Sequence, residues 1–461
     1  MKTRDLTKGS VKKNLLYMSL PTMAGFLAQT LYDVVDMMWI GRLSVEALAG
    51  VTIFATIFWL VEVLNEIIGS SSVSLIAQSY GEGNKKQTSK IIEQTIAFKG
   101  LVAIIAGIIL LFTLRPLAAF FDSNPRVIES VISYGYIRIF FIPIMFSSFT
   151  VNTALRSIGD SKKPFYLMLI SSILNVVLDP IFIFDTLPIK FGFIDITLNG
   201  FGLGVFGAAL ATVISITIAF GIGFYYLLAG KSYVKISLKG IFKLDKEIDY
   251  KLITIGLPNG AEALNRNLSN FVVMKFIGHY GSVAIAASGI GMRFMGLLFM
   301  PLVGLMMGGG AIVGQNIGVN QIDRAKETAK SAAQLGVALI SVVSLVTFFF
   351  DEQIMRLFTT EQEVIAIGAP MLKIFVLGMF LLAILFGYST VFSGSGYNIP
   401  FFISSFFGRW GGAIPFAFIA IYVLKLDIMW LWVSYLVGDF VEFMIIMYYY
   451  KQGKWQHKKV I

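Results

Sequence analysis

Acidic residues stand inside long apolar stretches of this 461-residue chain. Asp33 and Asp36 interrupt one stretch, and Asp179 interrupts another. Tyr32 lies four residues before Asp36, and Asn175 lies four residues before Asp179, so a carboxylate and a neutral polar group share one face of each helix. Oxygen-rich groups of this kind suit a proton or a hard cation. The alternative is a structural polar cluster, and Asp33 in particular could face a pore or an interface instead.

Two further pairs have the same helical spacing. Glu62 and Glu66 lie one turn apart and repel each other, so we expect them to share a proton, bind a cation or line a wet cavity that contacts substrate. Glu262 and Arg266 carry opposite charges, and we expect an ion pair within one helix. Each pair lies in a long apolar stretch, where burying an isolated charge costs free energy.

The composition explains the apolar surroundings. Apolar residues make up 56% of the chain, charged residues only 14%, and the mean hydropathy is +0.78. A soluble protein carries about 25% charged residues. The chain is therefore expected to be an all-α, polytopic membrane protein, and soluble enzymes and disordered regulators are excluded.

Runs of roughly 20 apolar residues, the length that a membrane span requires, occur twelve times. The predicted spans are 14–41, 47–78, 92–114, 128–155, 164–184, 203–229, 249–278, 284–314, 330–350, 365–393, 400–424 and 428–450.

Lys and Arg indicate the orientation of these spans. With a cytoplasmic N-terminus, the inside segments hold 24 Lys and Arg residues and the outside segments hold six. The positive-inside rule therefore places both termini in the cytoplasm, and we expect a multi-pass protein of a prokaryotic plasma membrane. The net charge of +10 is explained by this topology, so nucleic acid is not an expected partner.

The chain repeats itself with an offset of 237 residues. Under that shift Pro21 meets Pro258, while Gln78 and Gly81 meet Gln315 and Gly318. Six spans separate the copies, which predicts two parallel six-helix bundles around a central cavity, as in secondary transporters. The predicted parts are an N-lobe (1–230), a cytoplasmic linker (231–251) and a C-lobe with a basic tail (252–461). Asp36 falls on Val273, so coupling chemistry is expected in the N-lobe.

Several kinds of chemistry have no support in the sequence. Cysteine is absent, and the two histidines, His279 and His457, lie in a loop and in the tail, so thiolate or histidine metal sites and a catalytic triad are not expected. No complete nucleotide-binding motif occurs, which leaves an ion gradient as the energy source. We expect neither an enzyme nor a cofactor, only a coupling ion, H⁺ or Na⁺.

Several segments together resemble the multidrug and toxic compound extrusion (MATE) family. The most specific is Asn175-Val176-Val177-Leu178-Asp179-Pro180-Ile181-Phe182 in the fifth span. The others are Ser19-Leu20-Pro21, Leu31-Tyr32 with Asp36, Ala77-Gln78 with Gly81, and Gly207-Ala208-Ala209 with Thr212. The resemblance follows the whole chain in order and includes the duplication. It implies a cation-driven antiporter for amphipathic, mainly cationic drugs, built from two six-helix bundles and acting here as a monomer in the lipid bilayer.

The resemblance also implies roles for individual residues. The N-lobe cation site of the family falls on Tyr32, Asp36, Asn175, Asp179 and Thr212, and Asp36 and Asp179 would be the metal ligands if Na⁺ is the coupling ion. Pro21 matches the proline at which the first span bends. The substrate-binding candidates are Gln29 and Asn152, from the resemblance, and Asp33, Glu62 and Glu66, from their charge and position.

One position departs from a branch of the family. The NorM-like branch carries a glutamate where this chain has Arg266, so the pattern is more similar to the DinF-like branch. A lipid or lipid-linked oligosaccharide flippase of the same superfamily is the alternative function, and it would need a basic cavity. A passive channel is a further alternative, which would not require Asp36.

Overall fold

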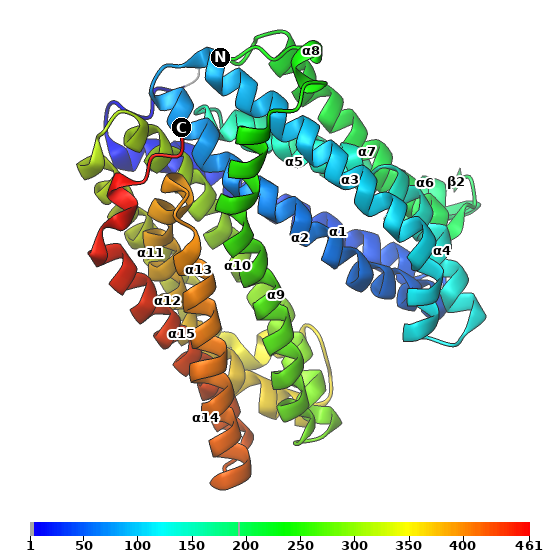
Figure 1. Ribbon diagram of the computed structural model, residues 1–461. Helices are drawn as coiled ribbons and strands as arrows, with labels where there is room; N and C mark the ends of the chain where they lie inside the picture. Colours follow the sequence, from blue (N-terminus) through cyan, green and yellow to red (C-terminus); the bar gives the residue numbers. More distant parts are fainter. Residues whose placement is uncertain (1–3, 192–193) are drawn as a thin grey trace. The chain divides into compact units, whose positions relative to one another are not determined.

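Helices account for nearly all of the chain in the computed structural model, which describes residues 4–191 and 194–461 (Figure 1). The first half contains α1 (Val11–Gly41), α2 (Val45–Gly81), α3 (Lys85–Phe121), α4 (Pro125–Phe140), α5 (Ile142–Ser157), α6 (Lys162–Ile183) and α7 (Gly204–Leu228). After the short α8 (Leu238–Ile241), the second half contains α9 (Lys246–Gly278), α10 (Ser282–Gly318), α11 (Ile322–Arg356) and α12 (Gln362–Ser395). The last elements are α13 (Ile399–Phe406), π-helix η1 (Phe407–Ala413), α14 (Ile414–Phe418), π-helix η2 (Ile419–Val423), α15 (Ile428–Gln452) and the 3₁₀-helix η3 (Lys454–His457).

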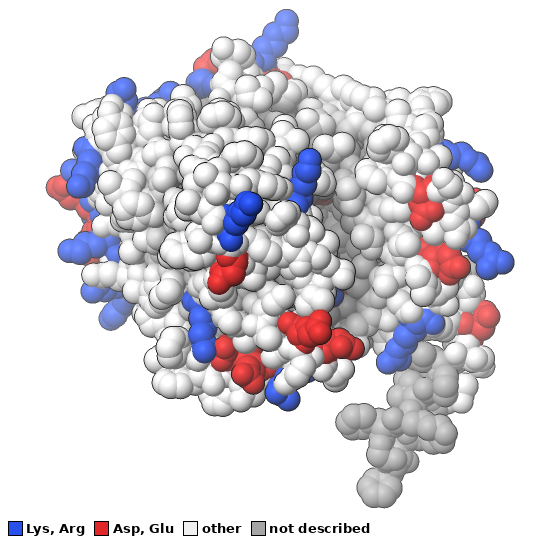
Figure 2. Space-filling model, turned by 90° about the horizontal axis from the view of Figure 1, so that it is seen from below, with Lys and Arg blue, Asp and Glu red and all other residues white. Residues whose placement is uncertain are grey.

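Each predicted span overlaps one of these helices or a run of them. Within the described residues, nine helices are long and apolar enough to cross a membrane, or ten if the bent pair α4 and α5 counts as one span. The other two predicted spans are α1 and α9, with 31 and 33 residues, whose charged and polar side chains lower their hydropathy. On the face shown in Figure 2, which looks onto the ends of helices, most residues are uncharged, and the Lys, Arg, Asp and Glu side chains lie singly or in small groups.

The fourth predicted span, 128–155, is bent in the structure. The chain turns by 56° between α4 and α5 at Phe141, and Pro143 lies in the first turn of α5. Proline has no backbone N–H and its ring clashes with the preceding turn, which favours a break or a kink at this position. A second unpredicted element is the antiparallel hairpin of β1 (Thr186–Phe191) and β2 (Ile194–Asn199) between α6 and α7.

The chain divides into two compact units, which we call the first and second units. The first contains Ala24–Ser72 and Lys85–Leu252, and the second contains Arg4–Met23, Val73–Asn84 and Ile253–Ile461. The start of α1 and the end of α2 thus belong with the second half of the chain. Within the second unit, α12 packs against α10, α11 and α15 (Figure 1).

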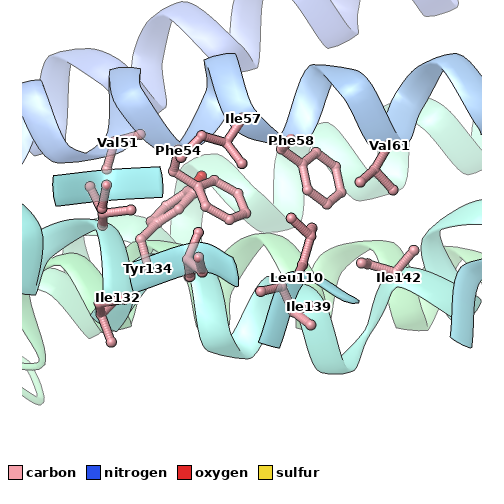
Figure 3. Close-up of a cluster of buried hydrophobic side chains, with 14 of the residues drawn as sticks. Val51, Phe54, Ile57, Phe58, Val61, Leu110, Ile132, Tyr134, Ile139 and Ile142 are labelled. Carbon is pink, nitrogen blue, oxygen red and sulfur yellow. The ribbon is translucent and has the colours of Figure 1, made fainter. Parts of the chain in front are cut away.

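The core of the first unit follows from a helical stripe on α2. Val51, Phe54, Phe58 and Val61 recur every three or four residues, so they lie on one face of the helix. Figure 3 shows this row facing α4, where Tyr134 packs edge-on against Phe54 at 5.3 Å between ring centroids. This packing holds α4 in place and with it the polar residues that α4 presents.

The predicted linker is attached to the N-terminal part of α3. Glu93 accepts a hydrogen bond from the Ser237 backbone N–H at 2.6 Å, and Gln94 accepts one from the Asp245 N–H at 2.7 Å. Lys90 pairs with Asp245 at 2.5 Å, and this hydrogen bond lowers the pKa of the Asp245 carboxyl. The connection between the halves is therefore tied to the first unit.

The repeated Gln and Gly residues meet each other where the end of α2 passes α10. A Cβ on Gly81 would lie 2.3 Å from the Gln315 backbone oxygen, and one on Gly318 would lie 2.4 Å from the Gln78 backbone oxygen. Both glycines are therefore required for the two backbones to approach so closely.

Gly318→Ala is expected to lower the melting temperature of the purified protein by several degrees, because overpacking of this kind costs roughly 1–3 kcal/mol. Gly289→Ala is the matched control on the same helix, since a Cβ there meets no atom within 4 Å. Thermal denaturation followed by size-exclusion chromatography measures both. Equal melting temperatures for the two variants would contradict the close helix approach.

Candidate functional site

Two buried carboxyl groups meet inside the first unit. Asp36 on α1 is 7% exposed, and Asp179 on α6 is fully buried. Their side chains are close enough to share a hydrogen bond. A hydrogen bond between carboxyl groups requires a proton, and two buried carboxylates without a proton or cation repel each other at high cost.

Two neutral side chains complete this cluster. The Asn175 amide donates to Asp179 Oδ1 and to Thr212 Oγ1, each at 3.2 Å. Thr212, on α7, donates in turn to the Ala208 carbonyl at 3.1 Å. The helical spacing of Asn175 and Asp179 produces the contact between these two side chains. Thr212 lies on α7, which packs against α6.

Three oxygen atoms in the cluster accept no hydrogen bond from the described residues: Asp36 Oδ1, Asp179 Oδ2 and Asn175 Oδ1. Unsatisfied buried acceptors are rare, and a group of them suits a proton or a hard cation. No set of three His, Cys, Asp or Glu side chains that could hold a metal ion occurs in the described part of the chain. A Na⁺ ion at Asp36 and Asp179 would therefore take neutral oxygens as its remaining ligands.

Tyr32, the fifth predicted coupling residue, lies one turn from Asp36 but contacts a different group of side chains. It interacts with Gln29 and Asp33. Asp33 itself is exposed, whereas Asp36 is buried. The structure thus brings together four of the five predicted residues and places Tyr32 beside them.

Arg138 is a neighbour of this cluster that the sequence analysis missed. It extends from α4, donates to the Tyr134 hydroxyl at 3.3 Å, and interacts electrostatically with Asp33 and Asp36. Its position well inside a predicted span was a signal of a buried cation. Arg138 offsets part of the negative charge of the aspartates.

A cavity of about 160 Å³ lies in the same unit. Of the predicted substrate-binding residues, Gln29, Asn152 and Glu62 line it, as does Tyr32, whereas Asp33 and Glu66 are not among its lining residues. The wall also includes residues that were not predicted to bind substrate: Phe26, Asn65, Met145, Ser148, Phe149, Arg156, Leu167, Met168, Ser171, Ser172, Ile216 and Ala219. Aromatic and apolar walls with a few polar groups are typical of small-molecule sites.

Lys99 explains why Glu62 and Glu66 can lie one turn apart. This lysine of α3 is fully buried, and its ammonium donates to Asn65 Oδ1 at 2.6 Å. Asn65 donates in turn to Glu62 Oε2 at 2.9 Å, and both glutamates interact electrostatically with Lys99. A cation from a neighbouring helix therefore reduces the repulsion between them.

Comparison with known proteins identifies the family. The MatE family model matches residues 21–181 and 258–419, so its two copies begin at the equivalent residues Pro21 and Pro258. This chain belongs to the MatE family. Its members are membrane transporters and not enzymes, and the chain is accordingly a multi-pass transmembrane transporter.

Several MatE relatives align over nearly the whole chain. A probable multidrug resistance protein of Bacillus subtilis, YoeA, is 31% identical over 99% of this chain and 97% of its own length. A probable multidrug resistance protein of Thermotoga maritima, NorM, is 26% identical over 98% and 94%. A solved transporter of the MOP superfamily from Pyrococcus furiosus shares the fold with a TM-score of 0.88, at 23% identity over 98% of both chains. The twelve-span, two-bundle MatE fold is thereby confirmed.

The second unit of this MatE protein contains a buried charge network of its own. Arg266 on α9 pairs with Glu262 at 2.7 Å, as the sequence predicts, and with Glu442 on α15 at 3.3 Å. Arg409, in the π-helical turn η1, pairs with Glu442 at 3.3 Å and with Asp439 at 3.6 Å. Arg409, Asp439 and Glu442 were missed in the sequence because their partners come from distant helices.

Arg409→Met is expected to lower the melting temperature substantially, because removing one partner of a buried ion pair costs roughly 3–5 kcal/mol. The Glu442 carboxylate, 1% exposed, would lose one of its two guanidinium partners. Adding Glu442→Gln should recover part of the loss, since a neutral amide tolerates burial better. Thermal denaturation of the single and double variants tests this, and an unchanged melting temperature for Arg409→Met would refute the coupling.

Proposed function

We propose that this MatE chain is a cation-coupled multidrug antiporter, driven by H⁺ or Na⁺, with Asp36 and Asp179 as its coupling site. The observation that supports this most is the buried carboxyl pair with unsatisfied acceptors around it. Such a site is stable with a proton or cation bound and costly when empty. It therefore has two occupancy states with a large difference in free energy.

That difference couples the ion to the substrate. A ligand shifts a conformational equilibrium only if it binds the two conformations with different free energy. Occupancy of the carboxyl pair changes the charge beside α1, and α1 also contributes Phe26, Gln29 and Tyr32 to the cavity. An ion that enters from outside would thus rearrange α1, weaken substrate binding and release the substrate on the outer side.

Pro21 lies where α1 passes from one unit to the other. The boundary between the two units falls between Met23 and Ala24, two residues after the proline. Before it, α1 packs closely on α10, since a Cβ on Gly308 would lie 2.7 Å from Ser19 Oγ. A helix held at one end, with a missing backbone hydrogen bond at Pro21, can bend at that point.

The exported compounds are amphipathic, and many are organic cations. The Phe26 and Phe149 rings and the Glu62 carboxylate in the cavity wall suit an aromatic or cationic molecule. The relatives named as multidrug resistance proteins support the same class of exported compounds. The charge distribution supports cytoplasmic termini in a prokaryotic plasma membrane. One chain contains both six-helix bundles and can therefore act as a monomer.

Asp36→Asn and Asp179→Asn are each expected to abolish gradient-driven export, because an amide neither releases a proton nor binds a cation as a carboxylate does. The purified protein would be reconstituted into vesicles, and the movement of ethidium across the vesicle membrane would be measured. A pH gradient and a Na⁺ gradient would be imposed separately. The gradient that drives movement by the unmodified protein identifies the ion.

Asp323→Asn is the control for the same chemical change, because Asp323 is fully exposed on α11. It should transport normally. Near-normal export by both site variants would reject the coupling site. No movement by the unmodified protein under either gradient would instead favour the flippase, with lipid-linked sugars as the next probes.

Pro21→Ala should leave ethidium binding nearly unchanged but reduce the transport rate several-fold. Alanine restores the backbone N–H that can bond to the Tyr17 carbonyl, so the helix becomes stiffer at the hinge. Equilibrium binding and initial transport rates separate the two effects. A normal rate in this variant would exclude bending at Pro21 as a required step.

A further inference from the structure

We propose that Arg156 binds the anionic group of a zwitterionic substrate, so the cavity of the first unit selects amphipathic compounds with a carboxylate as well as a cationic group. This rests on the proposed export function and narrows its substrate class. The cavity wall supplies both charges, with Arg156 as the cation and Glu62 as the carboxylate.

Arg156 is a buried cation without a carboxylate partner. It lies in the last turn of α5 and is 3% exposed. Its guanidinium donates to Thr153 Oγ1 at 3.3 Å and lies 5.9 Å from the centre of the Phe26 ring, and no ion pair involves it among the described residues. The nearby Asp160 pairs with Lys163 instead, at 2.9 Å. A buried guanidinium with one neutral acceptor is costly, and an incoming anion would remove that cost.

The other buried cations of the first unit have partners. Lys99 is held by Asn65 and faces Glu62 and Glu66. The half-buried Arg138 faces Asp33 and Asp36. Within the described part of this unit, Arg156 therefore stands apart as the buried cation that is left unbalanced. Because it also lines the cavity, its free donors are available to a bound molecule.

The fold itself does not require a cation at this position. The 237-residue repeat places Ser393 opposite Arg156, in the same place on the equivalent helix. Ser393 is buried beside Gly310, where a Cβ would lie 2.8 Å from its hydroxyl, so that site is filled by close packing. The first half has an arginine and a cavity where the second half has two small residues.

Neighbouring groups fit a carboxylate better than a metal or an apolar ligand. A guanidinium presents parallel N–H donors that match the two oxygens of a carboxylate. The Ser148 and Ser171 hydroxyls in the same wall can donate further hydrogen bonds, and Asn152, whose Oδ1 accepts none, can turn its amide toward the ligand. The Phe26 and Phe149 rings would cover the flat body of the molecule.

Rhodamine B and its ethyl ester provide matched probes. They share the cationic ring system, and only the acid carries a carboxylate. Binding to purified protein in detergent, measured by fluorescence titration without any gradient, should be about tenfold tighter for the acid. Arg156→Gln should remove this preference by weakening acid binding about tenfold while ester binding stays the same, and Arg156→Lys should retain part of it.

Lys86→Gln is the control, because it removes one positive charge from an exposed position of the same unit. It should keep the preference. Equal affinity of the unmodified protein for acid and ester would overturn the proposal even if Arg156→Gln fails to fold. So would an equal loss of both affinities in a folded Arg156→Gln variant.

The same experiment separates this proposal from antiport. Asp36→Asn should keep the preference for the acid, because Asp36 does not line the cavity, while it loses gradient-driven transport. An acid preference in a protein that moves no probe under any gradient would support Arg156 and reject antiport. Gradient-driven export without an acid preference would support antiport and reject the role of Arg156.

Discussion

The burial of charge in an apolar environment is the constraint on which this structure depends. Every ionisable group inside the helices must find a counter-charge, a proton or a cation, since the membrane offers no water to solvate it. Lys99 and the glutamates of α2 satisfy this within the protein, as do Arg409 and Glu442 in the second unit. Asp36 and Asp179 do not satisfy it fully, and neither does Arg156. The groups left unsatisfied are the ones available to a coupling ion and to a substrate.

Much of the fold could be predicted from the sequence because it depends on local patterns of residues. Long apolar runs defined the spans, and the helical spacing of Asn175 and Asp179 correctly placed both side chains on one face of a helix. The bend at Phe141 was missed although Pro143 marks it, because hydropathy does not distinguish a bent span from a straight one. The contacts that close the site are not local, so residue spacing alone could not show that Asp36 lies beside Asp179, and only the family resemblance grouped the two.

The cations were harder to predict than the acids. Lysine and arginine near the end of a span can extend to the aqueous interface, so Lys99 gave no clear signal. Arg156 lies one residue past the predicted span 128–155 and was counted among the 24 inside residues. Their burial depends on which helices surround them. Glu62 and Glu66 did contain a clue, because two like charges one turn apart indicate a partner elsewhere, and the structure provides Lys99. The coupling role of the aspartates remains a prediction.

The crossing of α2 and α10 brings equivalent residues of the two repeats together. Gly81 lies against Gln315, and Gly318 lies against Gln78. Such a reciprocal contact is the isologous arrangement that joins the identical subunits of a symmetric dimer. Fusion of the halves into one chain has let their charged residues diverge freely, but this surface must remain self-complementary. A larger side chain at Gly81 or Gly318 would meet backbone atoms of the other half, so no side-chain change at the equivalent position could make room for it.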